Sequence, residues 1–339
     1  MNKKTIILLV SLIAVVALFL ILRRNNSSTL GGNDKEFEFK STANIDKVFI
    51  SNRATGQYVT LTKVDSNHWR LNDKYNVNIY QLDILFEGLR NVRIKRPVSK
   101  NEMTLVKKDL ALRGSKVEIY EKGKLSKTYY IGNNAIAEMG TYFMMENGNE
   151  PYLCHIPGFN GYPGARYHST IEAWRSKSIF NSKPEEIKSI NINWTDNSAN
   201  SFTIDNSGQQ PVLISGTKTF VNNSEANLNL IKTYLKFWEL SYEGFPIDLT
   251  AHDIDSISKT KPFLKMELLR KDGTKTTLSI HRKGLKIDSP KQTDDDGNPL
   301  QFEMENYYAF IDGNTKEIVQ IQDFVFGKVM KITSDFLIQ

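Results

Sequence analysis

Cysteine is almost absent from this 339-residue sequence, which contains Cys154 and no other. A single cysteine excludes an intramolecular disulfide and any metal site built from several cysteines. Cys154 lies in residues 151–156, where the side chains alternate as in a strand. We therefore interpret it as a small buried hydrophobic residue.

Histidine is also scarce, and its spacing matches no common metal site. None of the five histidines forms the His-x-x-x-His or Glu-x-x-His pairs of zinc and di-iron sites. Serine nucleophile elbows and dinucleotide-binding fingerprints are missing as well. The sequence therefore predicts a protein that is not an enzyme and that has no cofactor.

Acidic residues are missing from residues 1–24, which carry Lys3, Lys4, Arg23 and Arg24. Removing these four charges from the net charge of +6 leaves +2 for all the remaining residues. The basic balance thus belongs to the N-terminus, and it is poor evidence for nucleic-acid binding.

The longest apolar run, residues 5–22, contains no charge. As a helix it would span about 27 Å, close to the hydrocarbon thickness of a bilayer. A cleaved signal peptide is the alternative, but Arg23 and Arg24 stand where small residues are needed. We expect residues 1–24 to form a transmembrane signal anchor, followed by a flexible spacer over residues 25–36. The short N-terminal tail favours a soluble region outside the cytoplasmic membrane.

The remaining sequence contains an internal repeat. The strand pattern of residues 45–51 recurs at residues 187–193, and that of residues 58–61 recurs at residues 201–204. A helical apolar stripe follows in each half, capped by Asn76 or Asn78 in the first and by Ser224 in the second. The stripes are Ile79, Leu82, Leu85, Phe86, Leu89 and Leu228, Ile231, Tyr234, Leu235, Trp238.

Two hairpins complete each half of the repeat. Glycines of the expected turns are Gly123 and Gly148 in the first half, and Gly273 and Gly313 in the second. The fold class predicted is α+β: a transmembrane helix followed by two tandem related units of antiparallel sheet plus helix. We expect the first unit over residues 37–157, a connector rich in glycine and aromatic residues over 158–184, and the second unit over 185–339.

Several short motifs resemble the DUF4340 family, which is defined by a domain of unknown function. They are His68-Trp69-Arg70-Leu71, Asn91-Val92-Arg93-Ile94-Lys95-Arg96-Pro97-Val98, Thr128-Tyr129-Tyr130-Ile131-Gly132, Gly140-Thr141-Tyr142 and Ala173-Trp174-Arg175-Ser176-Lys177. The resemblance implies a bacterial envelope protein with one N-terminal helix, often encoded beside ABC-exporter subunits of the gliding-motility type. It transfers no catalytic residue, because none is assigned to the family.

The connector provides one candidate contact site. Glycines allow a close backbone approach, and Phe159, Tyr162, Arg166 and Tyr167 offer stacking faces and a charge for a partner or ligand. Packing of these aromatic residues between the two units is the favoured interpretation, and contact with a partner protein or a glycan is the alternative.

A basic run provides a second candidate site. In a strand over residues 91–98, Arg93 and Lys95 lie on the face opposite Val92 and Ile94, and Arg96 extends the run. A solvated outer face is the favoured interpretation, and contact with anionic lipid is the alternative for a domain tethered near a membrane.

A third segment, from Asp294 to Glu305, partly matches an EF-hand calcium loop. The sixth position, where that loop requires glycine, is Pro299. A solvated turn is therefore favoured over a calcium site of another geometry.

Together these features predict a membrane-tethered, non-catalytic envelope protein at the bacterial cytoplasmic membrane. It would be an accessory or scaffold subunit of an ABC-type transport or gliding-motility-type complex. Its partners would be the bilayer and an integral membrane protein, and not nucleic acid. The alternatives are an envelope glycan- or lipid-binding module and an enzyme acting on envelope polymers between the two units.

Overall fold

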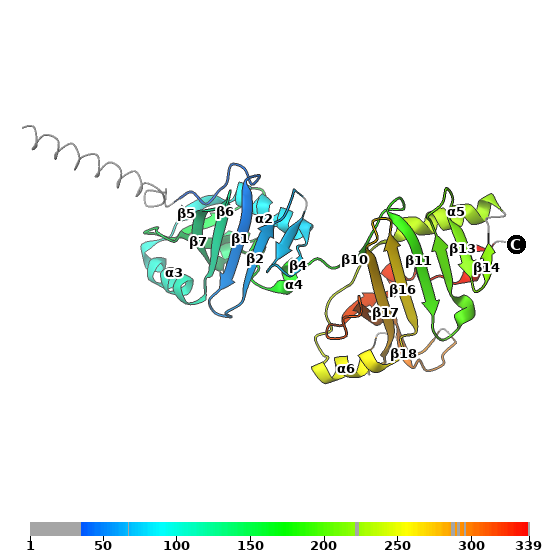
Figure 1. The fold of residues 1–339 in the computed structure, drawn as a ribbon. Coiled ribbons are helices and arrows are strands. Elements are labelled where there is room, and N and C mark those ends of the chain that lie inside the picture. The colour runs from blue at the N-terminus through cyan, green and yellow to red at the C-terminus, as the bar shows by residue number, and fades with distance from the viewer. Residues whose placement is uncertain are drawn as a thin grey trace, which may run out of the picture. The chain divides into compact units, whose positions relative to one another are not determined.

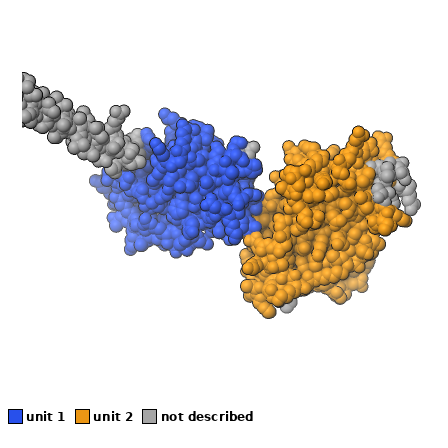
Figure 2. All heavy atoms as spheres, viewed as in Figure 1, with its two compact units in different colours: residues 1–176 blue, residues 177–339 orange. Residues whose placement is uncertain are grey.

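The computed structural model describes residues 35–66, 68–220, 224–285, 289, 292–294 and 296–337. The predicted anchor, and the spacer up to Asp34, lie outside these residues. Among the residues that are described, no helix is long and apolar enough to cross a membrane. The chain divides into two compact units, residues 1–176 and 177–339, which are described separately here (Figures 1 and 2).

The first unit is built on one antiparallel sheet of nine strands, in the order β4-β3-β2-β1-β6-β7-β8-β9-β5 (Figure 1). The strands are β1 (Ile45–Asn52), β2 (Tyr58–Lys63), β3 (Trp69–Leu71), β4 (Tyr75–Asn76), β5 (Arg93–Pro97), β6 (Ser115–Glu121), β7 (Lys124–Ala135), β8 (Gly140–Met145) and β9 (Tyr152–His155).

Two helices cover opposite faces of this sheet. Helix α2 (Ile79–Asn91) begins at Asn78, whose side chain accepts hydrogen bonds from two backbone N–H groups, and it buries Leu82, Leu85 and Leu89 in the main core. Helix α3 (Lys100–Arg113) packs with Tyr130 and its neighbours, whereas Tyr129 lies in the main core. Consecutive strand residues face opposite sides, so α3 covers the second face. Short helices η1 (Ile136–Glu138), η2 (Pro163–Arg166) and α4 (Ile171–Trp174) complete the unit.

The second unit contains an eight-stranded antiparallel sheet, in the order β14-β13-β12-β11-β16-β17-β18-β19. Strands β10 (Ser178–Asn181) and β15 (Glu239–Ser241) form a separate pair. The remaining strands are β11 (Ile187–Trp194), β12 (Phe202–Asp205), β13 (Val212–Ser215), β14 (Lys218–Phe220), β16 (Leu264–Arg270), β17 (Lys275–Gly284), β18 (Phe302–Ile311) and β19 (Val319–Gln322). The helices are η3 (Ser198–Asn200), α5 (Glu225–Tyr234), η4 (Leu235–Phe237), α6 (Ala251–Lys259), α7 (Asp323–Phe326) and η5 (Thr333–Phe336).

Eight strands have the same order in both large sheets, and the first sheet adds β5 at its edge. The register of the central strands also corresponds. Ile50 pairs with Val117 between β1 and β6, and Ile192 pairs with Met266 between β11 and β16. Both pairings also contain a register shift at the start of the first strand, after Ile45 and after Ile187. The α+β class is confirmed, and both predicted helices lie where expected, with Ser224 capping α5. Helices α3 and α6 were not predicted.

The first described residues are packed firmly into the first unit. Phe37 is only 2% exposed and Phe39 is also buried, with the Phe39 backbone N–H donating to the Leu89 carbonyl at 2.8 Å. The Lys127 ammonium donates to the Glu36 and Glu38 carbonyls at 2.7 and 2.6 Å, and burial lowers the pKa of this lysine. Side chain and backbone together hold the chain against the sheet from Glu36 onward.

The predicted connector is divided by the structure. Sequence reasoning ended the first unit near residue 157, but residues 158–176 belong to it because they complete its core. Tyr167 is buried edge-on against Tyr129 and Phe143, and Trp174 is fully buried. In the second unit the C-terminal residues Phe326, Val329 and Phe336 join the core in the same way.

Candidate functional site

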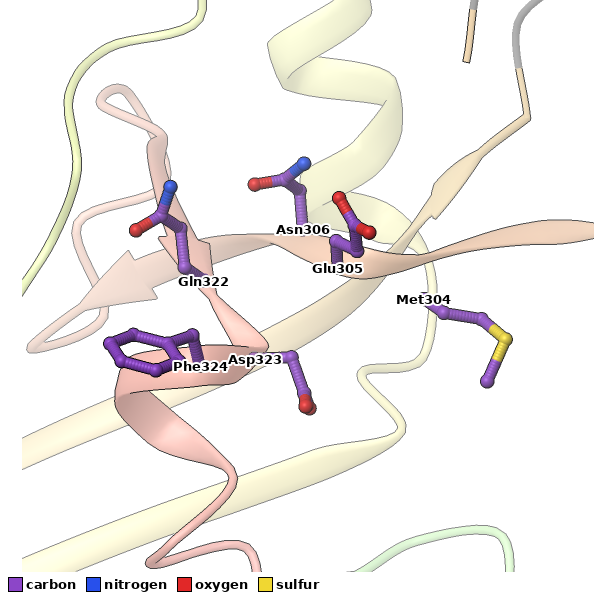
Figure 3. A pocket seen from close by; sticks show the side chains of 6 residues that line it. All are labelled: Met304, Glu305, Asn306, Gln322, Asp323 and Phe324. Carbon is purple, nitrogen blue, oxygen red and sulfur yellow. The ribbon is translucent and has the colours of Figure 1, made fainter. Parts of the chain in front are cut away.

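A pocket of about 610 Å³ opens on the second unit, near the start of β18 and at the end of β19, where α7 begins (Figure 3). Six residues line it: Met304, Glu305, Asn306, Gln322, Asp323 and Phe324. The lining therefore carries two carboxylates and two amides but no lysine, arginine or histidine.

Strand pairing brings the two halves of the pocket together. Asn306 on β18 pairs directly with Gln322 on β19, and Tyr307 pairs with Ile321. Tyr307 and Ile321 face the core of the unit. Because side chains alternate along a strand, Asn306 and Gln322 lie side by side on the other face. The chain then leaves the sheet and places Asp323 and Phe324 at the pocket edge.

A network of polar side chains holds the Asn306 side chain in place. Lys283 and Glu303 form an ion pair at 3.1 Å, with side chains only 14% and 8% exposed. Lys283 also donates to Gln320 at 3.2 Å. The Asn306 amide accepts from Gln320 and donates to Glu303, both at 3.4 Å. This largely buried ion pair and Gln320 together hold the Asn306 amide in one orientation.

The rim of the pocket is apolar and open to water. Phe324 is 95% exposed and Met304 is 51% exposed. The Tyr307 hydroxyl lies 3.0 Å from an Asp323 carboxylate oxygen and 3.2 Å from the Met304 carbonyl, which ties the two sides of the rim together. Burial, and then the charge of Asp323, raise the pKa of Tyr307, so the phenol stays protonated and can donate.

The two carboxylates of the pocket do not face each other. Figure 3 shows the Glu305 side chain pointing one way and the Asp323 side chain pointing the other. A paired acid and base would have to converge on one bond of a substrate. The arrangement is suited instead to holding a polar ligand by hydrogen bonds against an exposed ring.

The aromatic contact residues predicted in the connector have separate environments. Arg166 is buried against α2, where it donates to the Ile84 carbonyl at 2.9 Å and lies 3.3 Å from a Glu87 oxygen. Tyr167 lies in the core, and Tyr162 is half-buried. Phe159 is exposed, and the guanidinium carbon of Arg166 lies 4.5 Å from the centroid of its ring. Phe159 and Tyr162 thus retain accessible surface, whereas Arg166 and Tyr167 serve the packing of the first unit.

The three basic residues predicted to contact lipid all have protein partners. Arg93 pairs with Glu38, and the Lys95 ammonium donates to the Glu138 carbonyl at 2.7 Å. Arg96 is bonded to the carboxylates of Glu102 and Glu138. The guanidinium of Arg96, together with the Ser99 hydroxyl, lowers the pKa of Glu102 to about 2. The carboxylates beside Arg93 and Arg96 offset positive charge that contact with anionic lipid would use.

The segment that partly matches a calcium loop is a hydrogen-bonded turn. Both oxygens of Asp294 accept from the loop: one from the backbone N–H groups of Asp296 and Asn298, the other from the Asn298 amide. The twelfth position, Glu305, lies on β18 and lines the pocket. Within the part of the chain that the structure describes, no group of three or more histidine, cysteine or acidic side chains is placed to hold a metal. Cys154 is buried, which raises the pKa of its thiol.

Sequence reasoning missed the pocket. It gave no role to Met304, Asn306 or the residues from Gln322 to Phe324, and it considered Glu305 only as the twelfth position of a calcium loop. A usable signal was the turn at Asp312 and Gly313. Counting outward from that hairpin places residue 306 opposite residue 322, as the structure has it.

Comparison with known proteins identifies one family. The family model described as "Domain of unknown function (DUF4340)" matches residues 69–262, which is more than half of the chain and includes parts of both units. No curated protein matches the chain, and no solved structure does. The extent of this match shows that the chain belongs to the DUF4340 family.

Proposed function

We propose that this protein is a membrane-tethered, non-catalytic component of the bacterial cell envelope. In this proposal residues 1–24 anchor it in the cytoplasmic membrane, and the two units lie outside the cytoplasm. It would act as an accessory or scaffold subunit of an ABC-type transport or gliding-motility-type complex. The association with transporters rests on the family resemblance, and the tether rests on the chain itself.

The observation that carries the proposal is the packing of residues 36–39. Phe37 and Phe39 are buried, and Lys127 clamps the backbone beside them. Eleven residues, 25–35, therefore separate the predicted anchor from the first fixed residue of the first unit. Fully extended, such a linker spans about 38 Å.

A short linker has a consequence for binding. It confines the first unit to a thin layer above the bilayer, where integral membrane proteins also present their surfaces. Confinement of this kind raises the effective concentration of a binding domain near its partner without any new contact. A modest interface on either unit would then be sufficient for stable association.

Affinity purification tests the proposal. The tagged full-length protein is extracted with detergent, and co-purifying proteins are quantified by mass spectrometry. We expect at least one integral membrane protein to be strongly enriched over a tag-only control. Recovery of no membrane protein above background would overturn the proposal.

Two matched variants separate the contribution of the membrane anchor from that of partner recognition by the two units. In the first, an unrelated transmembrane helix replaces residues 1–24, and we expect the same partner to be recovered. In the second, the chain begins at Asn25, and we expect recovery to fall because the effective concentration is lost. A partner recovered equally well by this second variant would show that tethering contributes nothing.

A further inference from the structure

We propose that the pocket of the second unit binds an uncharged sugar residue presented by a glycan chain. The inference goes beyond the proposed function, because sugar binding can be measured with no membrane partner present. Its elements are the exposed ring of Phe324, the amides of Asn306 and Gln322, and the carboxylates of Glu305 and Asp323.

Phe324 supplies the stacking face. At 95% exposure, this ring offers nearly all of its apolar surface to solvent at the edge of a pocket. Exposed aromatic surface beside polar groups is typical of binding sites. One face of a pyranose presents several C–H groups, and these pack well on the electron-rich face of an aromatic ring.

The polar groups match the other property of a sugar, its ring of hydroxyls. Each hydroxyl both donates and accepts, as do the side-chain amides of Asn306 and Gln322. Carboxylates accept strong hydrogen bonds from hydroxyls. Glu305 supplies one on the side of Asn306, while Asp323, which already accepts from Tyr307, points the other way and lies at the pocket edge. Because Gln320 and Glu303 already hold the Asn306 amide, little side-chain freedom is lost there on binding.

The charge of the lining selects against anionic ligands. Two carboxylates and no cation line the pocket, so a phosphate, a sulfate or an anionic lipid headgroup would meet repulsion. A lysine-rich peptide would be attracted by the carboxylates. It would make little use of the two amides, because each amide offers a donor as well as an acceptor and a lysine ammonium only donates.

In the first unit, the position that corresponds to the pocket is filled by apolar packing. The pair Thr141–Cys154 takes the place of Tyr307–Ile321, which puts Gly140 where the second unit has Asn306. A Cβ on Gly140 would lie only 2.8 Å from the Leu153 side chain, so no side chain fits. Leu153 in turn stands where the second unit has Gln320. The polar pocket thus belongs to the second unit, while apolar packing fills its counterpart.

Direct binding tests the inference. The full-length protein is purified in a detergent without a sugar headgroup, which would otherwise compete. It is screened against neutral oligosaccharides of hexoses and N-acetylhexosamines, and the strongest is titrated by calorimetry. We expect saturable binding that Phe324→Ala weakens about tenfold, as expected for loss of an aromatic contact, with Gln322→Ala also weaker and melting unchanged in both.

The control variants are Phe159→Ala and Tyr80→Ala, which remove exposed aromatic side chains of the first unit. Both should bind like the parent. Three results would overturn the inference: no oligosaccharide binding at millimolar concentration, binding that Phe159→Ala abolishes and Phe324→Ala does not, or Phe324-dependent binding of a lysine-rich peptide or of anionic vesicles in place of sugars.

Discussion

At the scale of single residues, the partly buried polar groups of the second sheet are the most informative. Lys283, Glu303, Gln320 and Asn306 form a connected network on the face of the sheet opposite the main core. Networks of this kind are costly unless every member is satisfied, since the low local dielectric penalises an unpaired charge. They therefore hold groups in fixed positions, which is what a binding pocket needs.

His281 lies on the same face of the sheet and leads to a prediction about pH. Its ring nitrogen is 2.9 Å from the Thr260 hydroxyl, and its ring packs edge-on against Phe310. Desolvation, and then the charge of Lys265, lower its pKa from 6.5. Protonation therefore favours the unfolded chain, so this contribution to stability is complete above pH 6.5 and is lost as the pH falls through the lower folded pKa.

We expect His281→Gln to reduce the loss of stability between pH 7 and pH 5. The measurement is the urea midpoint of the parent and the variant across this range. His252→Gln, which removes an exposed histidine on α6, is the matched control and should retain the parental slope. Parallel pH profiles for the parent and His281→Gln would contradict the assignment.

At the scale of elements, residues 158–176 decide where the first unit ends. Tyr167 and Trp174 are buried in its core, and loss of a large buried aromatic costs about 3–5 kcal/mol. Losing both removes much of the 5–15 kcal/mol that is typical of a whole domain. We expect a chain of residues 35–176 to melt cooperatively and a chain of residues 35–157 not to fold. Equal melting curves for the two would show that the segment is a connector after all.

The elements that sequence reasoning found are those with strong local signals. The apolar stripe and the Asn78 cap located α2, and glycine at positive φ located the turns at Gly123 and Gly273. Helix α3 was missed because its apolar stripe is weak, although Ser99 and Glu102 form a capping box that marks its start. The packing of Tyr167 and the formation of the pocket depend on contacts between residues that are distant in sequence, and periodicity does not show such contacts.

At the scale of the whole molecule, one topology occurs twice with different surfaces. Both sheets share the order of eight strands, the register of the central pair and an early register shift, so the backbone plan is repeated. The position closed by Gly140 and Leu153 in the first unit is opened by Asn306 and Gln320 in the second. One copy is thus packed closed at this position, while the other is polar and open, which supports the proposed binding role of the second unit.

The proposed membrane location depends on residues 1–24 remaining attached to the rest of the chain. The direct measurement is the intact mass of the native protein in membrane and soluble fractions, after an alkaline wash that strips peripheral proteins. The account predicts a membrane-retained chain that still carries the residues from Lys3 to Arg24. A soluble chain whose first residue lies beyond Arg24 would contradict it.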